Sequence, residues 1–193
     1  AIIRDNVFAE NQAGFGAGVH VQDSELAVLA GNTVSANVAQ SRGGGIYALT
    51  CEVLLERNAI LGNEARKYGG GIYLDSSGAS LDANLVRGNQ ARLGGGGLYV
   101  LNSDPTLHNT VIVENHSEAT GGAGTVYGGA PRFFHTTLAR NTALSDGVGI
   151  VRGVDGLEIL VGEATLANTV LVGQQTGIFA EEGTSVALGS TLW

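Results

Sequence analysis

Apolar and polar positions alternate along short stretches of this chain. In "NEARKYGGGIYLDSSG", residues 63–78, Ile72 and Leu74 fall on one side of an extended backbone, and Tyr73 and Asp75 fall on the other. A period of two is typical of a strand with one buried face, and no apolar spacing of 3.6 residues persists long enough for a helix. The pattern therefore predicts an all-β protein built from short strands.

A second, longer period of 26 residues is superimposed on this alternation. One polar column contains Asn6, Asn32, Asn58 and Asn84 and continues as Thr110 and Thr136, and another contains Asn11, Asn37, Asn63, Asn89, Asn115 and Asn141. Apolar columns contain Phe8, Val34, Ile60, Val86, Ile112 and Leu138; Leu29, Leu55, Leu81, Leu107 and Phe133; and Val19, Ile46, Ile72, Leu98 and Val126. The chain is a tandem array of one repeating unit.

Three short strands per repeat, separated by turns, describe one rung of a parallel β-solenoid. Stacked rungs bury a continuous core that no single rung can bury alone. Glycine runs such as Gly69–Gly71 are then corner residues, and stacked Asn side chains form hydrogen bonds along the rod. We expect one domain over residues 1–193 with about seven rungs, which make a rod about 35 Å long.

The repeat becomes irregular toward the C-terminal end of the sequence. Asn168 lies 32 residues beyond Thr136, which predicts an irregular rung with an insertion of about six residues over 151–167. Neither end of the sequence shows a polar cap over its last rung, so we expect the chain to be a fragment of a longer protein.

The repeat resembles that of a known family. "FAEN" at 8–11 and the pattern NxAxxxGGGIY at 37–47, 63–73 and, with Leu98 for Ile, 89–99 are similar to the FxxN and GGA-aliphatic repeats of chlamydial-type polymorphic outer membrane proteins. More broadly, they resemble the right-handed parallel β-helices of the pectin-lyase-like superfamily. The resemblance implies a right-handed, single-stranded β-helix, consistent with the handedness of parallel crossovers. It also implies an extracellular or cell-surface location, as a stalk, adhesin or polysaccharide-processing enzyme.

Composition narrows the possible partners. The net charge of −8 argues against nucleic acid and against an anionic membrane surface, and no run of 18 apolar residues predicts membrane insertion. The single Cys51 excludes an internal disulfide framework. A neutral polysaccharide or another protein surface is the partner that this charge favours.

One outward column offers acid and base chemistry. Glu56, Asp82 and His108 are spaced by one repeat, so they should lie on neighbouring rungs and could perform general acid–base catalysis. A solvated polar face is the favoured interpretation, because no Arg or Lys column accompanies them. Asp75 and Asp104 are too isolated for a calcium cluster, and the four histidines share no ligand spacing. The sequence therefore predicts neither a metal nor a cofactor.

A second outward column is aromatic. His20, Tyr47, Tyr73, Tyr99 and Tyr127 each follow the inward aliphatic residue of the third apolar column. Four tyrosines should thus form one stripe, either as a stacked packing ladder or as a binding platform for sugar rings. If the chain binds a ligand by itself, we expect contact at Tyr47, Tyr73, Tyr99 and Tyr127.

These observations favour a rigid, non-catalytic display or adhesion module. Two alternatives stay open. The first is a β-helix that binds or degrades polysaccharide, which would require Glu56, Asp82 and His108 to converge in a groove with a basic neighbour. The second is a self-assembling rod whose ends associate as edge strands do.

Overall fold

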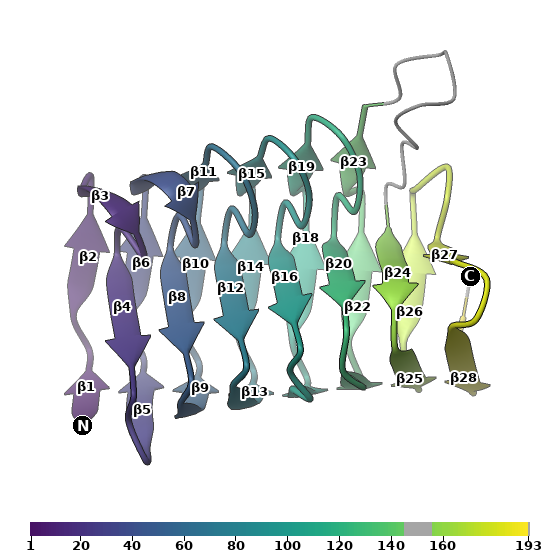
Figure 1. Cartoon of the computed structure of the whole chain (residues 1–193), viewed down its shortest axis with the longest axis horizontal. Coiled ribbons are helices and arrows are strands. Elements are labelled where there is room, and N and C mark those ends of the chain that lie inside the picture. The colour runs from purple at the N-terminus through teal and green to yellow at the C-terminus, as the bar shows by residue number, and fades with distance from the viewer. Residues whose placement is uncertain (145–155, 193) are drawn as a thin grey trace.

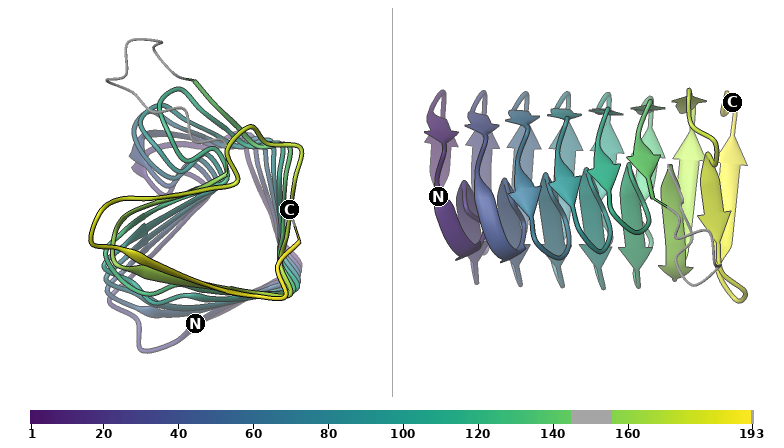
Figure 2. Two further views of the ribbon diagram at one scale, coloured as in Figure 1. Left: turned by 90° about the vertical axis from the view of Figure 1, so that its right-hand side faces the viewer. Right: turned by 90° about the horizontal axis from the view of Figure 1, so that it is seen from above.

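The computed structural model describes residues 1–144 and 156–192, and these residues form a parallel β-helix. The chain winds in successive rungs from the N-terminal end to the C-terminal end of a rod, as Figure 1 shows. The strands form four sheets, which we name A to D in chain order, and each regular rung as far as β23 adds one strand to each of them. Viewed along the rod, the rungs superimpose as a closed cross-section with a smaller lobe beside it (Figure 2, left).

Sheets A and B form two walls of this cross-section. Sheet A contains β1 (Ile2–Arg4), β5 (Ala27–Ala30), β9 (Glu52–Glu56), β13 (Gly78–Asp82), β17 (Thr106–His108), β21 (Arg132–Phe134), β25 (Glu163–Ala167) and β28 (Ser185–Gly189). Sheet B contains β2 (Val7–Ala9), β6 (Thr33–Ser35), β10 (Ala59–Leu61), β14 (Leu85–Arg87), β18 (Val111–Val113), β22 (Thr137–Ala139) and β26 (Val170–Val172). Every pairing within them is parallel, and most join residues 26 apart.

Sheets C and D complete each rung. Sheet C contains β3 (Gln12–Phe15), β7 (Val38–Arg42), β11 (Glu64–Ala65), β15 (Gln90–Ala91), β19 (His116–Ser117) and β23 (Thr142–Ala143). Sheet D contains β4 (Val19–Gln22), β8 (Ile46–Leu49), β12 (Ile72–Asp75), β16 (Leu98–Leu101), β20 (Gly124–Tyr127), β24 (Leu157–Val161) and β27 (Ile178–Ala180). The sequence predicted three strands per rung, and a regular rung has four, so this prediction is wrong. Most strands of sheet C have only two residues, too few to show an alternating pattern.

The apolar columns fill the interior of the rod. The side chains that point inward and are fully buried include Leu29, Leu55, Leu81, Leu107 and Phe133 from sheet A; Val34, Ile60, Val86 and Leu138 from sheet B; and Ile46, Ile72 and Val100 from sheet D. Each packs against its equivalents on the neighbouring rungs, so the core is continuous along the rod. Within the described residues there is no helix long and apolar enough to cross a membrane.

The asparagine columns form buried hydrogen-bonded ladders, as predicted. Asn63 is representative: its backbone N–H donates to Oδ1 of Asn89 at 2.9 Å, and its Nδ2 donates both to that oxygen and to the carbonyl oxygen of Val34, each at 2.9 Å. Asn63 and Asn89 are buried. One side chain thus satisfies polar groups on the rung before and the rung after its own.

The glycine runs are fixed by the rungs above and below them. Gly69 has a left-handed φ of +67°, which a side chain would strain. A Cβ at Gly70 would overlap the carbonyl oxygens of Gln90 and Gly96. Gly69, Gly70 and Gly71 each donate a backbone hydrogen bond of 3.1 Å to a glycine of the next rung. These glycines therefore permit close stacking and are ordered by it.

The register corrects the predicted columns at two places. Leu98 pairs with Gly124, so the 26-residue step is kept, and Val126 pairs instead with Val100. The "VY" at 126–127 resembles the "LY" at 98–99 but lies two residues further along its strand. Farther on, Thr137 pairs with Val170, a step of 33 residues. Thr169, rather than Asn168, thus follows Thr136, and residues 151–155 of the predicted irregular rung lie outside the described residues.

Candidate functional site

The predicted tyrosine stripe is a closely packed cluster. The rings of Tyr47 and Tyr73 are stacked with centroids 5.3 Å apart, and those of Tyr73 and Tyr99 are nearly parallel at 5.0 Å. Tyr68, from the turn after sheet C, packs on Tyr99 at 4.8 Å. We call Tyr47, Tyr68, Tyr73 and Tyr99 the tyrosine cluster. It lies on the outer face of sheet D, outside the main core.

The turn between sheets C and D covers this cluster. Tyr47, Tyr73 and Tyr99 expose only 4%, 1% and 8% of their surface. Arg42 lies over the Tyr73 ring at 5.3 Å from its centroid and forms an ion pair of 3.8 Å with Asp75. Burial raises the pKa of the Tyr73 and Tyr99 hydroxyls far above the ordinary value. Of the two interpretations of this column, the burial and stacking of the rings favour the packing ladder over an open binding platform.

Tyr127 lies outside the cluster. It pairs with Leu101, and the residue that continues the tyrosine column is Thr125. His20 does pair with Tyr47, and their rings meet edge to face at 4.9 Å. Tyr127 is 47% exposed, so it is the one predicted binding tyrosine with an accessible ring.

The acidic column is in the predicted register. Asp82 pairs with Glu56 on one side and with His108 on the other, along the outer face of sheet A. Their side chains have separate partners: Glu56 lies 3.7 Å from the guanidinium of Arg57, and Asp82 accepts a 3.3 Å hydrogen bond from Asn109. The His108 ring is stacked on Phe134 at 4.9 Å. Each group therefore interacts with a different neighbour.

Within residues 1–144 and 156–192, no three His, Cys, Asp or Glu side chains are placed to hold a metal ion. Cys51 is a free, buried thiol, and burial raises its pKa. Its backbone N–H donates to Oγ of Ser77, and Ser77 does the same to Ser103 on the next rung. Cys51 thus occupies one position of a short polar ladder.

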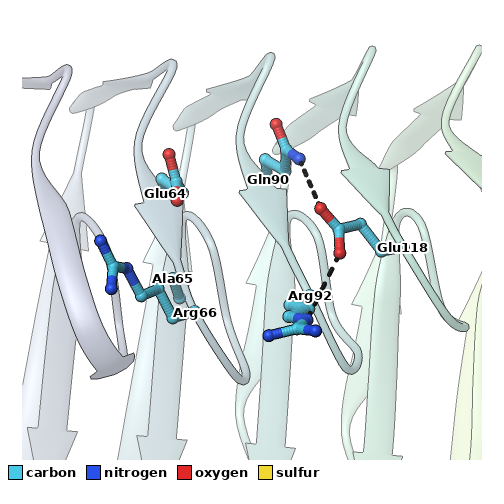
Figure 3. A pocket seen from close by; sticks show the side chains of 6 residues that line it. All are labelled: Glu64, Ala65, Arg66, Gln90, Arg92 and Glu118. Atoms are coloured by element: carbon cyan, nitrogen blue, oxygen red, sulfur yellow. Dashed lines mark hydrogen bonds and ion pairs between the residues drawn. The ribbon is translucent and has the colours of Figure 1, made fainter.

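A shallow cleft lies on the outer surface beside sheet C (Figure 3). It has a volume of about 300 Å³ and is lined by Glu64, Ala65, Arg66, Gln90, Arg92 and Glu118. Glu118 accepts from Nε2 of Gln90 at 3.4 Å and lies 3.6 Å from Nε of Arg92. Arg66 and Arg92 are one repeat apart, and this spacing was the signal in the sequence for the cleft. The columns considered for catalysis and binding did not include it, because they were confined to strand residues.

An ion-pair network was also missed. Glu114 lies between two guanidinium groups, at 2.7 Å from Nε of Arg87 and 2.7 Å from Nη2 of Arg140. Hydrogen bonds from Arg140 and Arg87 lower the pKa of the Glu114 carboxyl. All three side chains are exposed or partly exposed; Arg87 is the last residue of β14, and Glu114 and Arg140 lie in the turns that follow β18 and β22. Arg140 and Glu114 are one repeat apart, which is the spacing that brings them together.

Comparison with known families agrees with this geometry. A family model described as "right handed beta helix region" matches residues 1–160. The chain belongs to this family. No curated protein and no solved structure matches the chain. Membership of the right-handed β-helix family establishes the handedness of the winding and is consistent with the pectin-lyase-like superfamily. The fold alone leaves the choice between structural and polysaccharide-related roles to the surface.

Proposed function

We propose that this β-helix is a rigid, non-catalytic module for display or adhesion in a secreted or cell-surface bacterial protein. One observation carries the proposal: the side chains of the outward columns that stand out in the sequence are engaged with neighbouring residues, the tyrosines by packing and the acidic column by polar and ring contacts. Tyr47, Tyr73 and Tyr99 are buried in one cluster. Glu56, Asp82 and His108 each contact a different neighbour. The proposed location rests on the resemblance of the repeat to surface-displayed proteins.

The internal hydrogen bonds suit such a role. Backbone ladders in four sheets and the asparagine side chains connect each rung to its neighbours along the rod. Bending the rod would break several of these bonds together, because neighbouring rungs are paired in several sheets at once. A stack of this kind holds an attached segment at a fixed distance from its base.

Incubation with a panel of neutral and acidic polysaccharides tests the proposal. We expect no release of reducing ends and no formation of unsaturated uronates. The comparison variants are Glu56→Gln and Asp82→Asn, which keep the side-chain size while removing the charge. Turnover by the natural chain that either substitution abolishes would establish an enzyme and overturn the proposal.

Polysaccharide binding at the cleft beside sheet C is the second candidate function. The cleft of about 300 Å³ presents the Arg66 guanidinium as a donor and the carboxylates of Glu64 and Glu118 as acceptors for sugar hydroxyls. A glycan array probed with the natural chain and with Arg66→Ala tests it. Arg132→Ala, on the exposed face of sheet A, is the matched control. Binding that only Arg66→Ala weakens would support this candidate, and equal binding by all three would exclude the cleft.

A further inference from the structure

The outer face of sheet B is largely apolar. Ten of its fourteen outward side chains are apolar, three are hydroxyls and one is charged: Val7, Ala9, Thr33, Ser35, Ala59, Leu61, Leu85, Arg87, Val111, Val113, Thr137, Ala139, Val170 and Val172. Sheet A differs, since Glu56, Asp82, His108 and Arg132 all lie on its outer face. Val113 and Ala139 are already buried, and the other twelve side chains are exposed or partly exposed. An apolar face of this kind on a protein surface is typical of an interaction site.

Charged residues flank this face unevenly along the rod. Asp5 and Glu10 lie at the turns beside β2, and His135 and Arg140 occupy the same turn positions beside β22. Each of the four is exposed and has a left-handed φ between 50° and 59°. Among the ion pairs of the described residues, neither Asp5 nor Glu10 takes part in one. One end of the face is thus acidic and the other is basic.

The basic end keeps a net positive charge despite its ion pair. Arg140 shares the single carboxylate of Glu114 with Arg87, so two guanidinium groups oppose one carboxylate. An acidic group placed against this network would compensate the remaining charge. Asp5 and Glu10 are the acidic groups that border the same face at its opposite end.

We propose that a second copy of this chain covers the sheet B face, with the two rods antiparallel and the two-fold axis parallel to the strands. In this arrangement β2 faces β22 of the second copy, β6 faces β18 and β10 faces β14. Glu10 then faces Arg140 of the second copy, and Asp5 faces His135. Both contacts occur twice because the interface is isologous.

The apolar side chains also match in size in this arrangement. Ser35 of β6 faces the larger Val113 of β18, and Thr33 faces Val111, which has nearly the same shape. Ala59 of β10 faces the larger Leu85 of β14, and Leu61 faces Arg87, whose guanidinium is paired with Glu114. Small side chains opposite large ones allow two sheets to pack about 10 Å apart.

A parallel pairing of the two rods is disfavoured by charge. If the two-fold axis ran along the rod, each rung would face the same rung of the second copy. The turn before each strand would then lie opposite the turn after the strand. Asp5 would then oppose Glu10, and His135 would oppose Arg140. The first contact brings two carboxylates together, and the antiparallel arrangement replaces it with a contact between Glu10 and the guanidinium of Arg140, so electrostatics favours the antiparallel arrangement.

The size of the face sets the expected strength. Six rungs span about 29 Å along the rod, and the residues between the flanking turns span about 16 Å across it. The two copies together would bury roughly 900 to 1,000 Å², which is at the low end for specific interfaces. We therefore expect a reversible dimer with a dissociation constant in roughly the micromolar range.

Sedimentation velocity from roughly 10 µM to 1 mM protein tests the dimer. We expect the natural chain to change from monomer to dimer over this range. Glu10→Arg alone and Arg140→Glu alone should remain monomeric, because each places like charges opposite one another. An equimolar mixture of the two variants should dimerise, since opposite charges then meet at both contacts. At one contact of the mixed dimer, the arginine introduced at position 10 of one variant faces the glutamate introduced at position 140 of the other. At the second contact, the natural Glu10 faces the natural Arg140.

Two controls and three outcomes make the test decisive. Circular dichroism of each variant checks that it is folded, and Ser80→Arg, on the exposed face of sheet A, should dimerise like the natural chain. A monomeric natural chain at the highest concentration would overturn the proposal. A mixture that stays monomeric would also overturn it, as would growth beyond a dimer, which would indicate end-to-end stacking instead. The proposed dimer goes beyond the display function, and the sedimentation experiment tests it independently of that function.

Discussion

Individual asparagines connect the rungs of this protein. An interior ladder asparagine such as Asn63 accepts a hydrogen bond from the preceding rung and donates to both neighbouring rungs. Asn58, Asn63 and Asn89 are almost completely buried. Removing such a side chain leaves several buried polar groups without partners, which costs more than losing one bond. The asparagine columns are therefore the residues on which the stacking depends most strongly.

Replacement of Asn89 by alanine should lower the free energy of unfolding by about 2 to 4 kcal/mol, because it removes bonds to Ile60, Asn63 and Asn115. Urea unfolding followed by circular dichroism measures the loss. The neighbouring Gln90→Ala is the control, since Gln90 is an exposed amide with one long hydrogen bond of 3.4 Å. Equal losses for the two variants would contradict the role assigned to the ladder.

The residue columns could be predicted because the period is fixed. Asn and the inward aliphatic residues recur every 26 positions, and these assignments are confirmed up to Leu138 in sheet B. The prediction was wrong at Val126 and Tyr127, where local similarity of "VY" to "LY" was followed instead of the period. Hydrogen bonding between rungs preserves the register, so spacing was the better guide than residue identity.

At the scale of single elements, the turn between sheets C and D has the largest effect on the surface. It places Tyr68 on Tyr99, and Arg42, the last residue of β7, lies over Tyr73. Together they cover an outward face and make it a second apolar cluster. The sequence could not reveal this cover. Alternation shows only which face of a strand a residue occupies, and the path of a turn determines whether that face is exposed.

Stability should decrease as the pH rises above about 10, where the tyrosines of the unfolded chain ionise. The pKa of Tyr73 and Tyr99 is raised in the folded state, chiefly by burial, so the folded chain retains these protons longer than the unfolded chain. Their contribution is complete below the unfolded pKa and is lost as the pH rises toward the folded one. Urea midpoints between pH 8 and about 11 measure the decrease.

The double variant Tyr73→Phe/Tyr99→Phe should show a smaller decrease, because it cannot ionise at those two positions. Tyr127→Phe is the control, since Tyr127 lies outside the cluster and is 47% exposed. An unchanged pH dependence in the double variant would show that burial of these hydroxyls does not govern alkaline stability.

Sheet C shows why element boundaries were harder to predict than columns. Its strands β11, β15, β19 and β23 have two residues each, so no periodicity can develop within them. The cleft beside this sheet was missed for a related reason. Arg66 and Arg92 are outward residues of short turns, which the strand-based columns did not include.

At the scale of the whole molecule, every rung depends on its neighbours. Each rung contributes inward side chains from several sheets to a core that is continuous along the rod, and a defect therefore affects the rungs on both sides. This architecture could be predicted from repetition alone. The partner of an outward face could not be predicted in this way. The repeat restricts the inward side chains, which must pack against the neighbouring rungs, more strictly than the outward side chains.

Ile72→Asp should unfold several rungs, because it buries an unpaired charge at a site with no exposed surface. We expect a loss of several kcal/mol, measured as a lower thermal midpoint. Ser80→Asp, on the exposed outer face of sheet A, should change the stability by less than about 0.5 kcal/mol. Similar midpoints for both variants would contradict the inward and outward assignments.

Hydrogen–deuterium exchange of the glycine runs tests most directly the central claim that the rungs form one continuous stacked scaffold. The amides of Gly69, Gly70 and Gly71 donate to the next rung, so we predict slow exchange in a segment that would be highly flexible without stacking. The exposed turn at Glu25 and Leu26 should exchange fast in the same sample. Exchange at Gly69–Gly71 as fast as at that turn would contradict the stacked scaffold and the rigid function proposed from it.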